Sequence, residues 1–193
     1  LKKDKEKAIS LFLEAAEKGY VYAFNNLGKI YEEEDKELSI EYYKKSASLK
    51  ESWACNKIGE YYRKKKDYQK AFFYYQEALD TNEKNLCYYA YYNLAKYFYC
   101  MGSKENHLEK KESIYLEYLE IASEHNILEA SIELLLFYVN SYLTTQKEEL
   151  KKTIEKYKVK IECHPLFDGK IKKQVEEQLT KIKENLRLSF FDF

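Results

Sequence analysis

The sequence predicts an all-α fold assembled from repeated helix–turn–helix units. One proline and five glycines in 193 residues leave little material for strand turns or long loops. Apolar residues make up 45% and charged residues 34% of the chain, a mixture typical of amphipathic helices. Two helical patterns alternate along most of the sequence, which indicates an array of internal repeats.

The first helical pattern carries a small residue beside its central apolar position. It reads Ala23-x3-Leu27-Gly28-x2-Tyr31 and recurs 31, then 36, then 40 residues later, at 54–62, 90–98 and 130–138. Glycine costs about 1 kcal/mol in a helix interior, so its recurrence at Gly59 implies a packing reason. We expect the backbones of two helices to approach closely there.

The second pattern alternates with the first, beginning before its first copy, and has apolar or small residues spaced four and three apart. It covers residues 4–16, 35–47, 67–79 and, more loosely, 109–125, and an aspartate suited to N-capping starts each of the first three. The expected inner positions are Ala8, Phe12, Ala15 and Ala16; Ser39, Tyr43, Ser46 and Ala47; Ala71, Tyr75 and Ala78; and Ile114, Tyr118, Ile121 and Ala122.

These segments resemble known repeat families. Residues 58–78, with Ile58-Gly59-x2-Tyr62 followed by Asp67-Tyr68-x2-Ala71-x3-Tyr75-x2-Ala78, are similar to a tetratricopeptide repeat, and residues 7–31 resemble the related Sel1-like repeat. The resemblance implies a right-handed α-solenoid whose first helices line a concave groove. The chain departs from the pattern at Glu83, where tetratricopeptide repeats end in proline, and at Leu135, which replaces the small residue.

The pattern changes after residue 142, where residues 144–146 are expected to form a turn. Residues 150–161 and 171–186 then predict two helices with narrow apolar stripes, separated by Pro165. These helices would form a C-terminal helical hairpin that either caps the array or makes a homodimer seam. The apolar segment 189–193 is expected to dock, in cis or in trans.

Two regions follow: residues 1–142 as an array of about three and a half repeats, and residues 143–193 as capping or dimerisation helices. The array begins with a second-type helix that lacks its first-type partner. We expect an upstream helix in a longer protein; the alternative is that residues 4–18 form a native cap.

No constellation of catalytic or metal-ligating residues emerges from the sequence, so we expect neither an enzyme nor a cofactor. His107, His125 and His164 are scattered, and Cys163 beside His164 lacks further ligands. Four widely spaced cysteines predict a reduced, cytoplasmic protein. The 33 basic and 33 acidic residues balance, which argues against direct contact with nucleic acid or a membrane.

The resemblance implies four rows of groove-facing side chains on the first helices. Aromatic residues of one row would anchor a ligand, and mid-helix asparagines of the next could bond an extended peptide. The alternatives are that the aromatic residues pack between repeats and that composition explains the asparagines. The rows are Tyr22, Trp53 and Tyr89; Asn25, Asn56 and Tyr92; Lys29, Glu60 and Lys96; and Glu32, Arg63 and Tyr99.

The leading hypothesis is a non-catalytic scaffold that binds a protein or peptide in the concave groove. The mixed charge of the rows argues against a strongly acidic or basic ligand. The alternative is a peptide-sensing regulatory domain of a bacterial transcription regulator whose DNA-binding module lies outside this sequence. A repeat-built enzyme is the third and weakest hypothesis.

Overall fold

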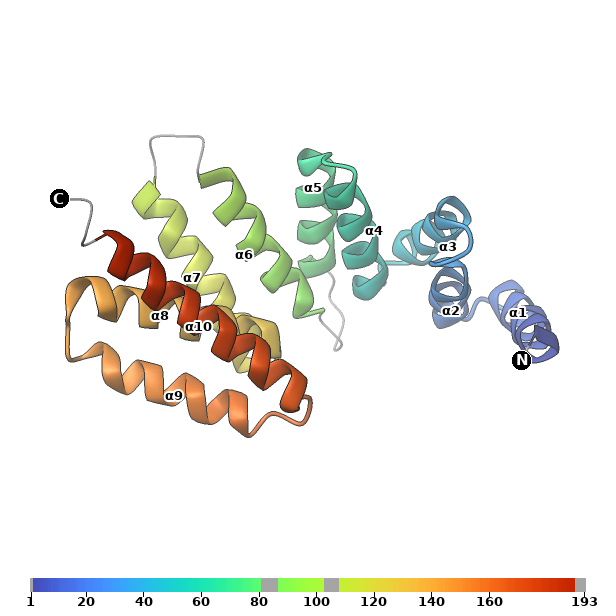
Figure 1. The fold of residues 1–193 in the computed structure, drawn as a ribbon. Helices are drawn as coiled ribbons and strands as arrows, with labels where there is room; N and C mark the ends of the chain where they lie inside the picture. The colour runs from blue at the N-terminus through green and yellow to red at the C-terminus, as the bar shows by residue number, and fades with distance from the viewer. Residues whose placement is uncertain (1, 81–86, 103–107, 190–193) are drawn as a thin grey trace. The chain divides into compact units, whose positions relative to one another are not determined.

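The computed structural model describes residues 2–80, 87–102 and 108–189, and this part of the chain contains helices and no strand (Figure 1). The all-α repeat fold expected from the sequence is confirmed. The helices are α1 Lys2–Glu17, α2 Val21–Tyr31, α3 Lys36–Ser48, α4 Ser52–Lys64, α5 Tyr68–Leu79, α6 Tyr89–Gly102, α7 Leu108–Glu124, α8 Leu128–Thr145, α9 Leu150–Glu162 and α10 Gly169–Ser189.

The chain forms two compact units, residues 1–97 and 98–193, which divide within α6. In unit 1 the first-type helix α2 packs on α3 and α4 packs on α5, while α1–α2 and α3–α4 contacts join successive repeats. Small and apolar side chains from the two predicted patterns supply the core of this unit, namely Ala23, Leu27, Tyr43, Ala54, Ile58, Ala71, Tyr75, Ala78, Ala90, Leu94 and Ala95.

The glycines of the first pattern have the expected packing role. Gly28 faces the ring of Tyr43, and Gly59 faces the ring of Tyr75. A Cβ atom at Gly59 would lie 2.5 Å from Cδ1 of Tyr75, closer than packed carbon atoms allow. Each glycine therefore makes room for a buried tyrosine of the following helix in the same repeat.

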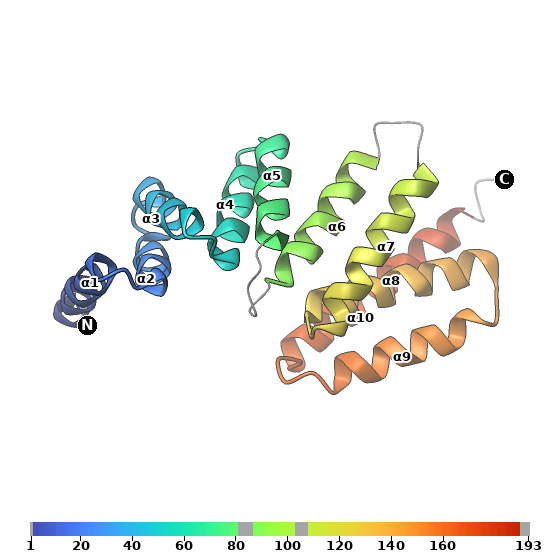
Figure 2. The ribbon, with the colours of Figure 1, turned by 180° about the vertical axis from the view of Figure 1, so that it is seen from behind.

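In unit 2, α7, α9 and α10 all pack against α8. The predicted hairpin corresponds to α9 and α10, which diverge from their connecting loop in both ribbon views (Figures 1 and 2). Ile154, Tyr157 and Ile161 of α9 are buried, as is Val175 of α10.

Of the four predicted inner positions of α7, Ala122 is buried as expected, and the other three are wrong by one residue. Ile114, Tyr118 and Ile121 are only partly buried, whereas the buried stripe, with the same spacing, is Tyr115, Leu119 and Ala122. Both stripes are apolar and adjacent on the helix, so spacing alone does not distinguish them. The expected turn at 144–146 also comes too early, since α8 continues to Thr145 and Gln146 is its C-cap.

Several connections contain a residue with left-handed backbone geometry. These residues are Gly19 (φ 85°), Lys50 (φ 62°), Lys66 (φ 61°), Asn126 (φ 62°) and Gln146 (φ 54°). Lys66 ends the basic run 63–66, of which Arg63 and Lys64 form the last turn of α4. Basic side chains there interact favourably with the helix dipole.

Replacing Lys66 by glycine is expected to raise the free energy of unfolding by about 0.5–1 kcal/mol, because glycine adopts positive φ without the steric cost that lysine has. Urea denaturation followed by circular dichroism measures this change. Lys44→Gly on the exposed face of α3 is the control and should lose about 1 kcal/mol. Equal losses in the free energy of unfolding at both positions would contradict the positive φ of Lys66.

Candidate functional site: the first-helix face of the N-terminal repeats

The predicted aromatic row is exposed at its ends and packed at its centre. Tyr22 and Tyr89 are 59% and 40% exposed. Trp53 instead contacts Tyr43 edge-to-face, with ring centroids 5.4 Å apart, and Nζ of Lys57 lies 5.3 Å from the centre of the indole ring. Trp53 thus joins the core cluster around Tyr43 and Ile58 while keeping part of its surface accessible.

The predicted asparagines are buried and bonded within the chain. Nδ2 of Asn25 donates to Oε2 of Glu51 over 2.7 Å, and Oδ1 of Asn56 accepts from Nδ2 of Asn93 over 2.9 Å. The second bond connects first-type helices α4 and α6 of consecutive repeats. These bonds favour a structural role for Asn25 and Asn56 over peptide binding. The sequence reasoning missed Asn93, which lies one position after Tyr92 and therefore outside the predicted rows.

A pocket of about 340 Å³ opens between α3 and α4, beside the end of α2. It contains Glu60 and Glu32 of the predicted rows. The sequence frame missed Lys36, Ile40 and Tyr43 because it considered only first helices. It missed Lys57, Tyr61 and Lys64 of α4 because their positions lie outside its four rows. The lining residues are Glu32, Glu33, Lys36, Ser39, Ile40, Tyr43, Lys57, Glu60, Tyr61, Lys64 and Lys65.

One lysine connects the two carboxylates of the pocket. Nζ of Lys57 lies 3.5 Å from Oε1 of Glu32 and 3.6 Å from Oε2 of Glu60. The Tyr43 hydroxyl donates to Oε1 of Glu32 over 2.6 Å. Burial and the Glu32 carboxylate raise the pKa of Tyr43 well above its usual range, so this phenol stays a neutral donor.

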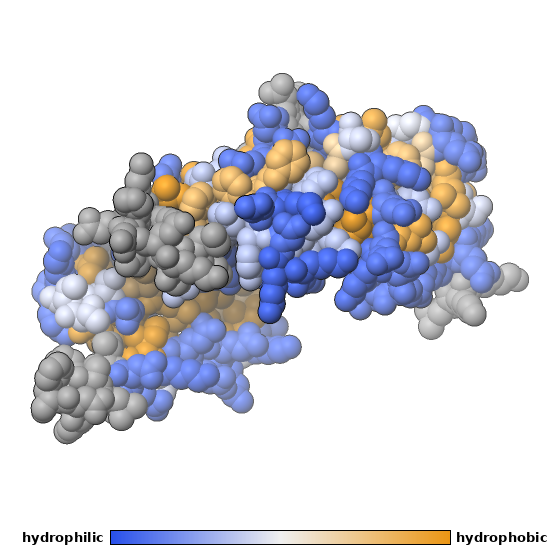
Figure 3. Space-filling model, turned by 90° about the horizontal axis from the view of Figure 1, so that it is seen from above, coloured by the Kyte–Doolittle hydropathy of each residue, from blue (hydrophilic) through white to orange (hydrophobic). Residues whose placement is uncertain are grey.

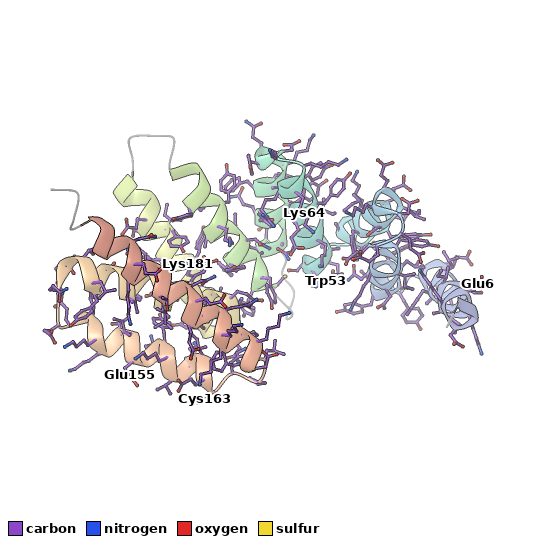
Figure 4. All side chains as sticks on the ribbon, viewed as in Figure 1. Glu6, Trp53, Lys64, Glu155, Cys163 and Lys181 are labelled. Carbon is purple, nitrogen blue, oxygen red and sulfur yellow. The ribbon has the colours of Figure 1, made fainter. Side chains whose placement is uncertain are left out.

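The pocket and Trp53 share one face of α4. Trp53, Lys57, Glu60 and Lys64 follow one another at spacings of four, three and four, which places them in a row along a helix. Figure 4 shows Trp53 and Lys64 at opposite ends of α4. The row therefore runs the length of the helix, from an aromatic end to a charged end.

A family model named Sel1 repeat matches residues 1–20, 24–51, 54–80 and 89–126, more than half of the chain. The chain belongs to the Sel1 repeat family. The three longer matches each span a first-type helix and the second-type helix after it, whereas residues 1–20 cover α1 alone. Sel1 repeats generally mediate protein–protein interaction. A search of curated proteins finds no match to this chain.

The other predicted positions of the Sel1 array have mixed environments. Lys29 and Arg63 are exposed, and Nζ of Lys96 lies 5.4 Å from the centre of the Tyr92 ring. Tyr99 belongs to unit 2, where its ring centroid lies 5.2 Å from that of Tyr115. Figure 3 shows hydrophilic side chains over most of one face, with smaller apolar areas between them.

His164 has a structural role in unit 2. The Leu166 N–H donates to Nδ1 of His164 over 3.1 Å, so Nε2 carries the proton and donates to the carbonyl of Asn126 over 3.0 Å. These bonds tie the α9–α10 loop to the α7–α8 turn. Among the described residues no group of three His, Cys, Asp or Glu side chains could hold a metal ion. His107 lies outside the described residues.

No helix in the described ranges is long and apolar enough to cross a membrane. The expectation for segment 189–193 falls largely outside the described residues, which end at Ser189.

The cysteines differ in burial and should differ in reactivity. Burial raises the pKa of Cys55 to about 12 and that of Cys87 to about 11. Both thiols therefore stay protonated at a pH at which an accessible cysteine already forms its reactive thiolate. Cys163 is exposed, in the loop after α9 (Figure 4). In native protein at about pH 8, iodoacetamide should therefore modify Cys163 and spare Cys55 and Cys87.

Mass spectrometry of the separate peptides measures the three modification rates, and urea-unfolded protein is the control in which all should react. An unfolded thiol ionises near the ordinary pKa of 9.0 whereas folded Cys55 does not, so stability should fall as the pH rises above that value. In the iodoacetamide experiment, rapid modification of Cys55 in the native protein would contradict the burial of this side chain on α4.

Proposed function

We propose that this Sel1 array is a non-catalytic scaffold that binds a segment of another protein along the α4 face. The observation that carries the proposal is the continuous row from Trp53 through Lys57 to the pocket. Family membership supports a protein partner. The exposed aromatic residues Tyr22 and Tyr89 would widen the contact surface, since tyrosines contribute strongly to protein interfaces.

The pocket chemistry suits a segment that carries both charges. Glu32 and Glu33 offer acceptors for a lysine or arginine of the partner, and Lys64 and Lys65 can pair with its carboxylates. Part of the Trp53 surface can receive an apolar side chain. A purely acidic or purely basic segment would leave one set of these charges unpaired.

Two exposed pocket residues allow a test that spares the core. The double variant Glu33→Lys/Lys64→Glu exchanges the negative charge at position 33 with the positive charge at position 64 and keeps the net charge of the chain. Glu41→Lys/Lys44→Glu, on exposed positions of α3 outside the pocket, is the matched control. Proteins captured from extracts of the source cells by each tagged form would be compared quantitatively by mass spectrometry.

The pocket variant should lose specific partners that the unchanged chain and the control variant retain, with equal helix content in circular dichroism. Identical partner sets for all three forms would overturn the choice of the α4 face. Loss in both variants would show that general surface charge, and not this pocket, determines capture.

A further inference from the structure

Unit 2 contains an open pocket lined by side chains of α8, α9 and α10, which we call the wedge. The ribbons of α9 and α10 diverge from their connecting loop (Figures 1 and 2). The volume of the wedge is about 500 Å³. Burial decreases along α10 towards the open end, since Val175 is buried whereas Leu179 and Ile182 are only partly buried. The lining residues are Val139, Tyr142, Leu143, Lys151, Ile154, Glu155, Lys158, Leu179 and Lys183.

The wedge combines an apolar floor with a basic rim. Val139, Leu143 and Leu179 are partly exposed apolar side chains from two helices. Lys151 pairs with Glu148 over 2.7 Å and Lys158 with Glu155 over 3.6 Å. Lys183 has no ion-pair partner among the described residues, so the rim has unused positive charge. An occupant should therefore bring apolar side chains and at least one carboxylate.

The segment that follows α10 has this chemistry. Residues 190–193 read Phe-Phe-Asp-Phe, with three aromatic side chains and one acid. We propose that these residues of the same chain fill the open end of the wedge, with phenylalanines on the apolar floor and Asp192 at the lysine rim. The proposal concerns unit 2 and does not depend on the function proposed for unit 1.

Residues 190–193 are long enough to reach back from the end of α10 to the wedge. Six residues of helix separate Lys183 from Ser189, an axial distance of about 9 Å. Four extended residues span up to about 13 Å, so a tail that turns back after Ser189 reaches the level of Lys183. Burying the phenylalanines there would remove their surface and part of the wedge surface from water.

A photo-crosslinking amino acid in place of Phe191, in the full chain, tests the proposal. Irradiation should join this position to wedge residues such as Val139, Leu143 or Leu179 of the same molecule, identified by mass spectrometry of monomer bands. The same amino acid at Leu166, which is 64% exposed in the α9–α10 loop, is the control and should not mark those residues.

Charge exchange then tests the role of Asp192. Asp192→Lys should lower the intramolecular crosslink yield about two- to fivefold, the range for an exposed ion pair, and Lys183→Glu in the same molecule should restore it. Crosslinked dimers would overturn the proposal in favour of a second copy as occupant. Crosslinks outside the wedge, or none, would overturn it as well.

Discussion

Replacing Gly59 by alanine is expected to lower the free energy of unfolding by about 2 kcal/mol. In most helices this substitution stabilises by about 1 kcal/mol through helix propensity. Here the added methyl group would meet Cδ1 and Cε1 of Tyr75 at 2.5 Å, and the ring is fully buried. Overpacking of a rigid core costs about 1–3 kcal/mol or more, and the short distance places this site at the upper end.

Urea denaturation of the purified variant measures the change, and two further variants identify its cause. Gly169→Ala should be harmless because no atom lies within 4 Å of the added methyl group. Tyr75→Leu should partly rescue Gly59→Ala, so that the double variant loses less than the sum of the single losses. A Gly59→Ala protein as stable as the unchanged chain would contradict the close packing of α4 on α5.

Replacing Glu51 by alanine is expected to cost about 2–4 kcal/mol. Glu51 is only 5% exposed; its Oε2 atom accepts from the N–H of Ala54 over 2.8 Å and from Nδ2 of Asn25 over 2.7 Å. Loss of the N-cap of α4 costs about 1 kcal/mol. Loss of the second bond leaves the Asn25 amide buried without a partner, which costs about 1–3 kcal/mol more.

Glu51→Gln is the conservative control, because its amide oxygen can still accept these bonds, and it should lose less than Glu51→Ala. Adding Asn25→Leu to Glu51→Ala should recover stability, since the unpaired amide is then removed. Both comparisons use equilibrium denaturation. If Asn25→Leu and Glu51→Ala act additively, the bond between the two side chains does not contribute to stability.

The sequence predicted the helices and repeats of this chain because their signals are local. Spacings of four and three at Ala71, Tyr75 and Ala78 determine which side of α5 is buried, and Asp67 caps that helix as expected. The register of α7 could not be predicted in the same way. Ile114 and Tyr115 start two neighbouring apolar stripes, and the choice between them depends on which surface the adjacent helices cover.

The candidate site was predictable only in part. The exposure of Tyr22 agrees with its predicted row, whereas Trp53 in the same row packs on Tyr43 of the preceding helix. The side-chain oxygen of buried Asn56 is bonded by Asn93, which is 37 residues away and on another repeat. The pocket likewise needs Tyr43 and Lys36 of α3, whose approach to α4 is a property of repeat stacking and not of either helix pattern alone.

The pairing of a glycine with a buried tyrosine also restricts how such an array can evolve. A larger residue at Gly28 or a different ring at Tyr43 is harmful unless the other position changes too. Duplication of a whole repeat copies both partners together and preserves the fit. A recombination breakpoint between α4 and α5 preserves it only if the incoming helix brings a tyrosine at the matching place, so the repeat, and not the single helix, is the heritable unit of this fold.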